Sequence, residues 1–150
     1  MNCLPVCINL ENRRVLVVGG GIAAFEKIEL LKRFGADFTV VGESLDERIV
    51  DSIADCRLRR WRDEDLDGIW LTYACDEARE SNARLKCAAN ARGILINTPD
   101  DPSLCDFLSP AIYRQGAMTV AVSSGGADVR RAIEWRDRVK LLFGDANDRD

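Results

Sequence analysis

Three consecutive glycines are the first residues in this sequence whose type and spacing point to chemistry. Gly19, Gly20 and Gly21 follow a run of β-branched and aliphatic residues, and Ala24 comes three positions later. This spacing fits the G-x-G-x-x-A fingerprint of dinucleotide-binding turns, in which the glycines permit a tight turn and a close approach of the backbone to a pyrophosphate. Free amides and the helix dipole would then face the phosphate charge. A glycine turn that only packs is the alternative interpretation.

An acidic residue about twenty positions after the glycines belongs to the same fingerprint when it ends the next strand. Glu43 follows Val41 and is the candidate. Its carboxylate could accept hydrogen bonds from the ribose hydroxyls of an adenosine. No arginine stands beside Glu43 to receive a 2′-phosphate, so the pattern favours NAD over NADP. An exposed loop glutamate without a ligand is the competing interpretation.

A rigid acidic loop, Asn97-Thr98-Pro99-Asp100-Asp101-Pro102, follows the fifth expected strand. Open α/β sheets bind ligands at the carboxyl ends of their strands, and this loop leaves the sheet there. One of its carboxylates could act as a general base or orient a cation. Aspartate and proline are also ordinary turn residues, so the composition alone equally predicts a turn.

A second glycine-rich segment, Ser123-Ser124-Gly125-Gly126, precedes the last expected helix. Its amides, together with the helix dipole, could hold an anion. The same residues would also serve as a plain N-cap. The two interpretations do not exclude each other.

The chain has 150 residues, with no histidine and six cysteines. The lack of histidine excludes Ser–His and Cys–His nucleophilic catalysis, so acid–base chemistry must fall to carboxylate, lysine, tyrosine or cysteine side chains. The cysteines contain no C-x-x-C pair and are expected to be reduced thiols. No metal-ligating set is predicted.

The overall charge and hydropathy limit the classes of partner. The formal net charge is −4, whereas nucleic-acid binding needs a clustered positive excess. No signal segment and no apolar run long enough to span a bilayer are present, so neither a nucleic-acid nor a membrane partner is expected. We expect a cytoplasmic protein.

Alternating strand and helix patterns must position these candidates. The expected strands are Arg14–Val18, Phe38–Val41, Cys56–Trp61, Ile69–Ala74 and Ile94–Asn97, and the expected helices are Ile22–Phe34, Leu45–Ala54 and Glu77–Arg92. Short links between them predict an α/β fold, a Rossmann-like parallel sheet with helices on both faces. Residues 1–107 are expected to form this domain.

The pattern changes in residues 108–150. Leu108–Tyr113 and Met118–Val122 read as two strands of a β-hairpin, and a helix is expected from about Asp128 to Leu142. We therefore expect a small β-hairpin plus helix region after the Rossmann-like domain.

Several of these residues, taken in order, resemble the precorrin-2 dehydrogenases, which form the N-terminal domains of sirohaem synthases. The resemblance rests on Leu4-Pro5, Val17-Val18-Gly19-Gly20-Gly21 with Ala24 and Lys27, Asn97 with Asp100-Asp101-Pro102, Cys105-Asp106-Phe107, Pro110-Ala111-Ile112 and Val120-Ala121-Val122-Ser123-Ser124-Gly125-Gly126. The glycine turn is generic, but the Asp-x-Pro loop followed by Ser-Ser-Gly-Gly in this order is specific.

The resemblance implies an NAD-dependent oxidation of precorrin-2 to sirohydrochlorin on the route to sirohaem, and in some members ferrous iron insertion in the same pocket. It implies that Asp100 is catalytic, that Ser124 is the regulatory serine, and that the hairpin–helix region builds a homodimer. The candidate cofactor-binding residues are Gly19, Gly20, Gly21, Ile22, Ala23, Glu43, Ser44, Cys75 and Asn97. The candidate anchors for the substrate carboxylates are Arg114, Ser124, Gly125 and Gly126.

The sequence also departs from that family. Members usually continue into a helical domain that encloses the tetrapyrrole, whereas this sequence stops at Asp150, and Asp128-Val129 replaces the Ser-Pro of the family. One alternative is therefore a shortened, non-catalytic homologue that binds NAD or a tetrapyrrole as a sensor, carrier or partner subunit. Another is an NAD module for an unrelated substrate.

Overall fold

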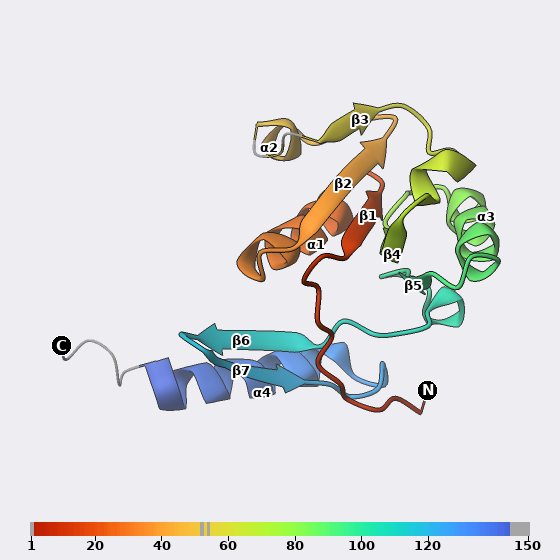
Figure 1. The fold of residues 1–150 in the computed structure, drawn as a ribbon. Coiled ribbons are helices and arrows are strands. Elements are labelled where there is room, and N and C mark those ends of the chain that lie inside the picture. Colours follow the sequence, from red (N-terminus) through yellow and green to blue (C-terminus); the bar gives the residue numbers. More distant parts are fainter. Residues whose placement is uncertain (1, 52, 54, 145–150) are drawn as a thin grey trace. The chain divides into compact units, whose positions relative to one another are not determined.

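A computed structural model describes residues 2–51, 53 and 55–144 of the chain. They divide into two compact units, which are drawn in Figure 1. The first unit is Cys7–Phe107, and the second joins Met1–Val6 with Leu108–Asp150.

A five-stranded parallel sheet forms the first unit. Its strands are β1 (Arg14–Val18), β2 (Asp37–Gly42), β3 (Cys56–Leu58), β4 (Ile69–Ala74) and β5 (Leu95–Asn97). Their order is β3-β2-β1-β4-β5, so the chain moves outward from β1 in one direction and then returns to its other side. The reversal makes the carboxyl ends of β1 and β4 a topological switch point, where such sheets bind ligands. This confirms the predicted Rossmann-like fold.

Helices cover both faces of the sheet (Figure 1). Helix α1 (Ile22–Arg33) lies on one face with the short α2 (Glu47–Val50), and α3 (Arg79–Asn90) lies on the other. Alternate residues of β1 divide between the two cores: Val15 and Val17 pack beneath α1, whereas Leu16 and Val18 pack beneath α3. Burial on both faces explains why β1 is an unbroken apolar run in the sequence.

Several elements are shorter than predicted: α3 is Arg79–Asn90 rather than Glu77–Arg92, and α2 and β3 lose the largest fraction of their predicted length. Helix α2 begins after Asp46, whose carboxylate accepts from the Arg48 amide at 3.0 Å and so caps the helix there. The predicted end at Ala54 lies outside the described residues. Strand β3 stops at Leu58 rather than Trp61, because the Arg59 amide turns back to the Arg57 carbonyl at 3.0 Å.

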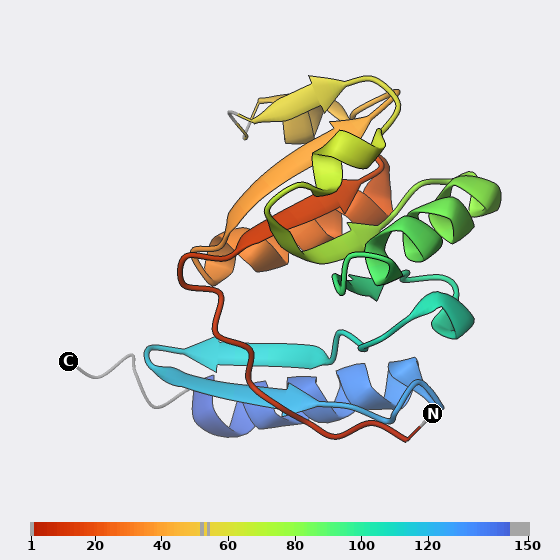
Figure 2. The ribbon, with the colours of Figure 1, turned by 45° about the vertical axis from the view of Figure 1, so that its right-hand side comes forward.

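An antiparallel hairpin and one helix form the second unit (Figure 2). The strands are β6 (Ala111–Gln115) and β7 (Met118–Val122), joined by a two-residue turn, and α4 (Val129–Gly144) packs against them. The hairpin is confirmed, but β6 begins after Pro110 rather than at Leu108, since proline has no amide hydrogen to pair. Among the described residues, no helix has the length and apolar character needed to cross a membrane.

Candidate nucleotide-binding site

The glycine turn between β1 and α1 is held in place by two neighbouring strands. The Gly19 amide donates to the Val41 carbonyl at 2.8 Å, and the Cys75 amide donates to the Val18 carbonyl at 2.7 Å. Gly19 has φ of +114°, and a Cβ there would overlap the Cys75 carbonyl. Only glycine fits this position, because both the backbone conformation and the neighbouring strand exclude a side chain.

Gly20 is also required by packing, although it occupies the variable position of the fingerprint. A Cβ on Gly20 would overlap the Ser44 carbonyl, and the Gly20 carbonyl accepts from the Asp46 amide at 2.9 Å. The middle glycine therefore fastens the turn to the segment after β2, a role that the fingerprint does not predict. Ser44, a candidate cofactor contact, lies in this segment.

Gly21 is different, because the space beside it is open. The atom nearest to a Cβ on Gly21 would be Oε1 of Glu77, at 3.6 Å, and the residue has an ordinary extended backbone. It is the N-cap of α1 and makes no side-chain cap, and the first turn, which includes Ile22 and Ala23, holds no acidic residue. Uncapped amides beside free space fit a pyrophosphate.

Glu43 lies at the end of β2, as predicted, but it has a cationic neighbour. Nε of Arg60 donates to Oε1 of Glu43 at 2.8 Å, and both side chains are exposed. The expectation that no arginine lies beside Glu43 is therefore wrong. Arg60 is distant in the sequence and reaches Glu43 from the segment after β3, which pairs with β2.

The two aspartates after β5 have different surroundings. Asp101 accepts from both Nε and Nη2 of Arg79, at 3.1 and 2.7 Å, and from the Ser103 amide. The Ser103 hydroxyl and the Arg79 guanidinium hold the pKa of Asp101 below its ordinary value. Asp100 is exposed, and within the described part of the first unit no side chain forms an ion pair or hydrogen bond with its carboxylate. Asp101 is thus structural, while Asp100 is available for chemistry.

A thiol closes the loop that carries Asp100. Sγ of Cys105 accepts from the Thr98 amide at 3.2 Å and donates to the Thr98 carbonyl at 3.1 Å. Nδ2 of Asn97 donates to the Phe107 carbonyl at 2.9 Å, which fixes the orientation of that amide. These contacts hold both ends of the loop against β5.

Cys75 links the acidic loop to the glycine turn. Its thiol is buried at the carboxyl end of β4, and burial raises its pKa to about 12; nearby Lys27 opposes this rise, while Asp100 and Glu26 add to it. The Cys75 carbonyl lies against Gly19, so the end of β4 is in direct contact with the glycine turn. The Cys75 backbone, rather than its thiol, faces the turn.

Two buried polar atoms at the end of β5 are without partners in the described structure. They are Oδ1 of Asn97 and Oγ1 of Thr98, in residues that are each 3% exposed. Buried polar atoms are normally hydrogen-bonded, so unpaired ones beside a candidate site indicate where a ligand would bind. Together with the open space at Gly21, they fit a dinucleotide that extends from β1 to β5.

A buried carboxylate that sequence reasoning missed supports one wall of the site. Asp65, 6% exposed, accepts from Arg57 at 2.7 Å, from Arg59 at 2.6 and 2.7 Å, and from the Arg62 amide at 2.8 Å. These contacts outweigh burial and lower its pKa to about 2. The cluster of arginines around residue 60 was the available signal, but it does not reveal which acid they surround.

The remaining candidates lie in the second unit. Oγ of Ser124 accepts from the Asp128 amide at 2.8 Å, and Oδ1 of Asp128 accepts from the Arg131 amide at 2.9 Å. Gly125 and Gly126 both have positive φ. Ser124 and Asp128 thus shape the start of α4, in agreement with the N-cap interpretation. Arg114 is exposed on β6, and its Nε lies 3.4 Å from the Gly116 carbonyl.

Across residues 2–51, 53 and 55–144, no group of three or more acidic or cysteine side chains is arranged to hold a metal ion.

Residues 6–111 match the model of a family described as "Putative NAD(P)-binding". The chain belongs to this NAD(P)-binding family. The match covers the glycine turn, Glu43 and the loop that carries Asp100, so the family assignment rests on the same segment as the geometry.

Relatives of this NAD(P)-binding chain include siroheme synthases. It is 38% identical over 147 residues to the "Siroheme synthase" of Methylobacillus flagellatus, which covers 95% of this chain and 32% of the relative. It is 39% identical over 148 residues to "Siroheme synthase 2" of Yersinia pestis, covering 95% of this chain and 31% of the relative. The chain thus spans about a third of the length of the curated relatives it matches.

A precorrin-2 dehydrogenase is among the solved structures with a similar fold. It is named "SirC, precorrin-2 dehydrogenase", and it superposes with a TM-score of 0.76 at 24% identity. The superposition covers 93% of this chain and 70% of the other. The fold of the NAD(P)-binding chain is therefore shared with that protein.

Proposed function

We propose that this chain oxidises precorrin-2 to sirohydrochlorin with NAD as the electron acceptor and Asp100 as the general base. The siroheme synthase relatives and the similar fold of SirC support the substrate class. The observation that carries the proposal is the pairing of a free carboxylate, Asp100, with an open glycine turn on the same edge of the sheet. The reaction needs both a proton acceptor and a dinucleotide.

The residues of the first unit have separate tasks in this proposal. The amides at Gly21, Ile22 and Ala23 bind the pyrophosphate, and Glu43 accepts hydrogen bonds from the adenosine ribose, which favours NAD. Asn97 and Thr98 offer their unpaired oxygens to the nicotinamide end. NAD supplies the site with an acceptor for the hydride that leaves a ring carbon of the substrate. Asp100 takes the proton that leaves a pyrrole nitrogen, so the step yields sirohydrochlorin, NADH and one proton.

The second unit has substrate anchors in this proposal. Precorrin-2 carries many carboxylates, and Arg114 together with the amides of Ser124 and Gly126 offers groups that bind them. The Gly125 amide donates to Oγ of Ser123 at 3.1 Å, so Gly125 contributes the shape of the segment. Asp128 adds a negative charge beside these anchors. We therefore assign the main share of carboxylate binding to Arg114.

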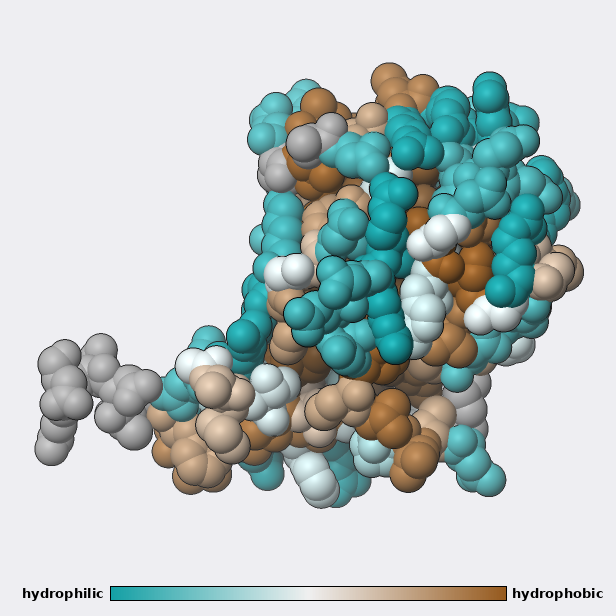
Figure 3. Space-filling view, in the orientation of Figure 1, coloured by the Kyte–Doolittle hydropathy of each residue, from teal (hydrophilic) through white to brown (hydrophobic). Residues whose placement is uncertain are grey.

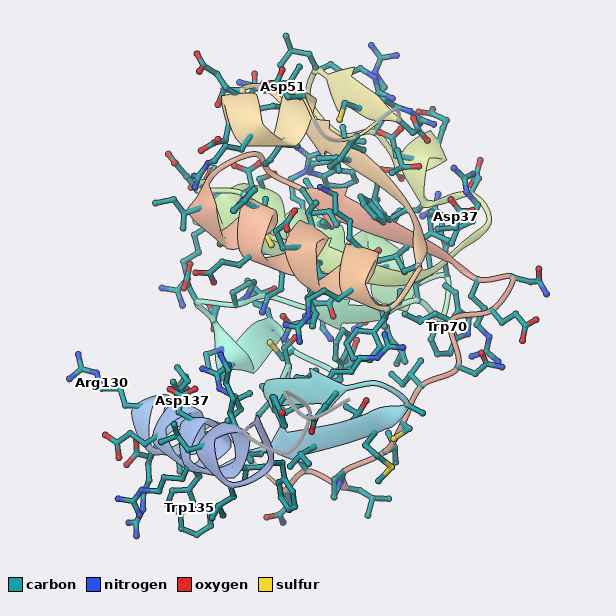
Figure 4. All side chains as sticks on the ribbon, turned by 90° about the vertical axis from the view of Figure 1, so that its left-hand side faces the viewer. Asp37, Asp51, Trp70, Arg130, Trp135 and Asp137 are labelled. Atoms are coloured by element: carbon teal, nitrogen blue, oxygen red, sulfur yellow. The ribbon has the colours of Figure 1, made fainter. Side chains whose placement is uncertain are left out.

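A homodimer through the second unit is part of the same proposal. Figure 3 shows hydrophobic residues over this unit, and Trp135, Leu141 and Leu142 on α4 are 52%, 74% and 75% exposed. Exposed apolar patches of this kind commonly mark interfaces. Figure 4 shows Trp135 and Arg130 projecting from α4. Sedimentation should give a dimer for the wild type and for Arg130→Ala, and a monomer for Trp135→Glu; a monomeric wild type would contradict this.

The proposed reaction is tested with precorrin-2 and NAD by following sirohydrochlorin absorbance. Asp100→Asn should lower turnover by roughly a hundredfold or more while NAD binding, measured by calorimetry, is unchanged. Asp51→Asn, an exposed residue that follows α2, is the matched control and should keep full turnover.

Two outcomes would decide against parts of the proposal. Undiminished turnover in Asp100→Asn would remove the catalytic role of Asp100. A wild-type chain that binds NAD but gives no turnover, even with a separately expressed helical partner, would favour the non-catalytic homologue.

A further inference from the structure

A cavity of about 290 Å³ adjoins the glycine turn in the first unit. It opens at the carboxyl ends of β1 and β2, where Val18, Val41 and Glu43 line it. Three arginines, Arg59, Arg60 and Arg84, complete its charged wall. In the proposed binding mode this cavity receives the adenosine half of the cofactor, because Glu43 is the residue assigned to the ribose.

The three arginines are not equally free to move. Arg59 is held by both oxygens of the buried Asp65, and Arg84 lies over the ring of Trp61 at 5.3 Å. Arg60 is 82% exposed and forms an ion pair with Glu43, which is itself 62% exposed. Among these three arginines, Arg60 is therefore the one that can leave Glu43 and bind another anion near the adenosine ribose.

We propose that Arg60 sets the cofactor specificity of this cavity by binding the 2′-phosphate of NADP in place of Glu43, so that the chain accepts both NAD and NADP. This rests on the proposed dinucleotide binding and goes beyond it, because Glu43 alone would predict strong rejection of NADP. A glutamate at the end of the second strand selects the ribose diol, whereas a nearby arginine accommodates the phosphate. This chain places both groups in one ion pair.

Replacing the Arg60–Glu43 ion pair by a contact between Arg60 and the 2′-phosphate requires little free energy. An ion pair between exposed side chains changes an equilibrium by about fivefold or less, whereas charge-assisted bonds to phosphate are stronger and bidentate. Glu43 can turn to solvent when the phosphate takes its place. Asp76 and Glu80 also line the cavity and oppose the phosphate, while Arg59 and Arg84 offset their charge. We therefore expect wild-type affinities for NAD and NADP within about tenfold of each other.

The test measures binding rather than turnover. Calorimetric titration with NAD and NADP is carried out on the wild type, Arg60→Gln and Glu43→Gln, with Arg62→Gln as the matched control. Arg62 is an exposed neighbour outside the cavity lining. Circular dichroism melts establish that all four proteins are folded. Titration with 5′-AMP and 2′,5′-ADP isolates the adenosine half from the nicotinamide half.

We expect the Arg60 substitution to weaken only the ligands that carry a 2′-phosphate. Arg60→Gln should weaken NADP and 2′,5′-ADP by about tenfold or more while NAD and 5′-AMP change by less than about twofold, and Glu43→Gln should invert the preference toward NADP. The inference is overturned if Arg60→Gln leaves the NADP-to-NAD ratio unchanged, or if the wild type already rejects NADP by a hundredfold. A wild type that binds neither dinucleotide would instead overturn the proposed function, and this inference with it.

Discussion

The Cys75 carbonyl occupies the space that a side chain on Gly19 would need. This contact joins the glycine turn to the carboxyl end of β4, so the turn and β4 cannot shift independently. Gly19 is therefore required by the fold, whereas Gly21, with open space around it, is required only by the proposed ligand. The two glycines of one fingerprint should respond differently to the same substitution.

Gly19→Ala should destabilise the protein by about 3 kcal/mol or more, because a methyl group meets backbone atoms at a strained positive φ. Urea unfolding measures this. Gly35→Ala is the matched control: Gly35 also has positive φ (+64°), but apart from its chain neighbours no described residue has an atom within 4 Å of the added Cβ. Equal losses of unfolding free energy in the two variants would show that the overlap with the Cys75 carbonyl does not destabilise the protein.

Gly21→Ala should leave the fold intact and weaken NAD binding. The loss of stability should be about 1 kcal/mol or less, since alanine is only a poorer N-cap than glycine. The methyl group would stand where the pyrophosphate approaches, so calorimetry should show binding weakened by about tenfold or more. Unchanged affinity in a folded variant would mean that the cofactor does not pass this turn.

Glu77→Gln should strengthen NAD binding. The Glu77 carboxylate lies 3.6 Å from the position of a Cβ on Gly21, so its charge opposes a pyrophosphate there. We expect a gain of about two- to fivefold at low ionic strength that shrinks as salt screens the repulsion. Glu47→Gln on α2 is the control. Weaker binding in Glu77→Gln would show that this carboxylate accepts a bond from the cofactor instead.

Asp65 should make stability depend on acid. Its folded pKa of about 2 lies below its ordinary value of 3.8, so its contribution is complete above pH 4 and is lost as the pH falls toward 2. The shift corresponds to roughly 2 kcal/mol. Asp65→Asn should lose at least this amount at pH 7 and little near pH 2 in urea titrations. The exposed Asp67→Asn should follow the wild type, and a parallel curve for Asp65→Asn would contradict the assignment.

The sequence predicted an element correctly where its local hydrophobic pattern matches its position in the fold. The strands Arg14–Val18 and Ile69–Ala74 have the predicted bounds, because both are apolar runs buried on two faces. The glycine turn and Glu43 also lie where the fingerprint places them.

Partners that meet across strands could not be predicted. Arg60 reaches Glu43 from 17 residues away, and Arg79 holds Asp101 from 22 residues away. The two aspartates are identical neighbours, so their residue type does not tell them apart. Asp101 is engaged by Ser103 within the loop and by Arg79 of α3, whereas Asp100 is left open.

The hydrogen bonds between the Cys105 thiol and the Thr98 backbone limit the length of the chain between these two residues. Surface loops usually accept added or deleted residues. This loop has both ends fastened, and two identical acids stand side by side within it. A single-residue insertion or deletion would place the wrong carboxylate opposite the turn, so the spacing of this segment should be far less permissive than its exposure suggests.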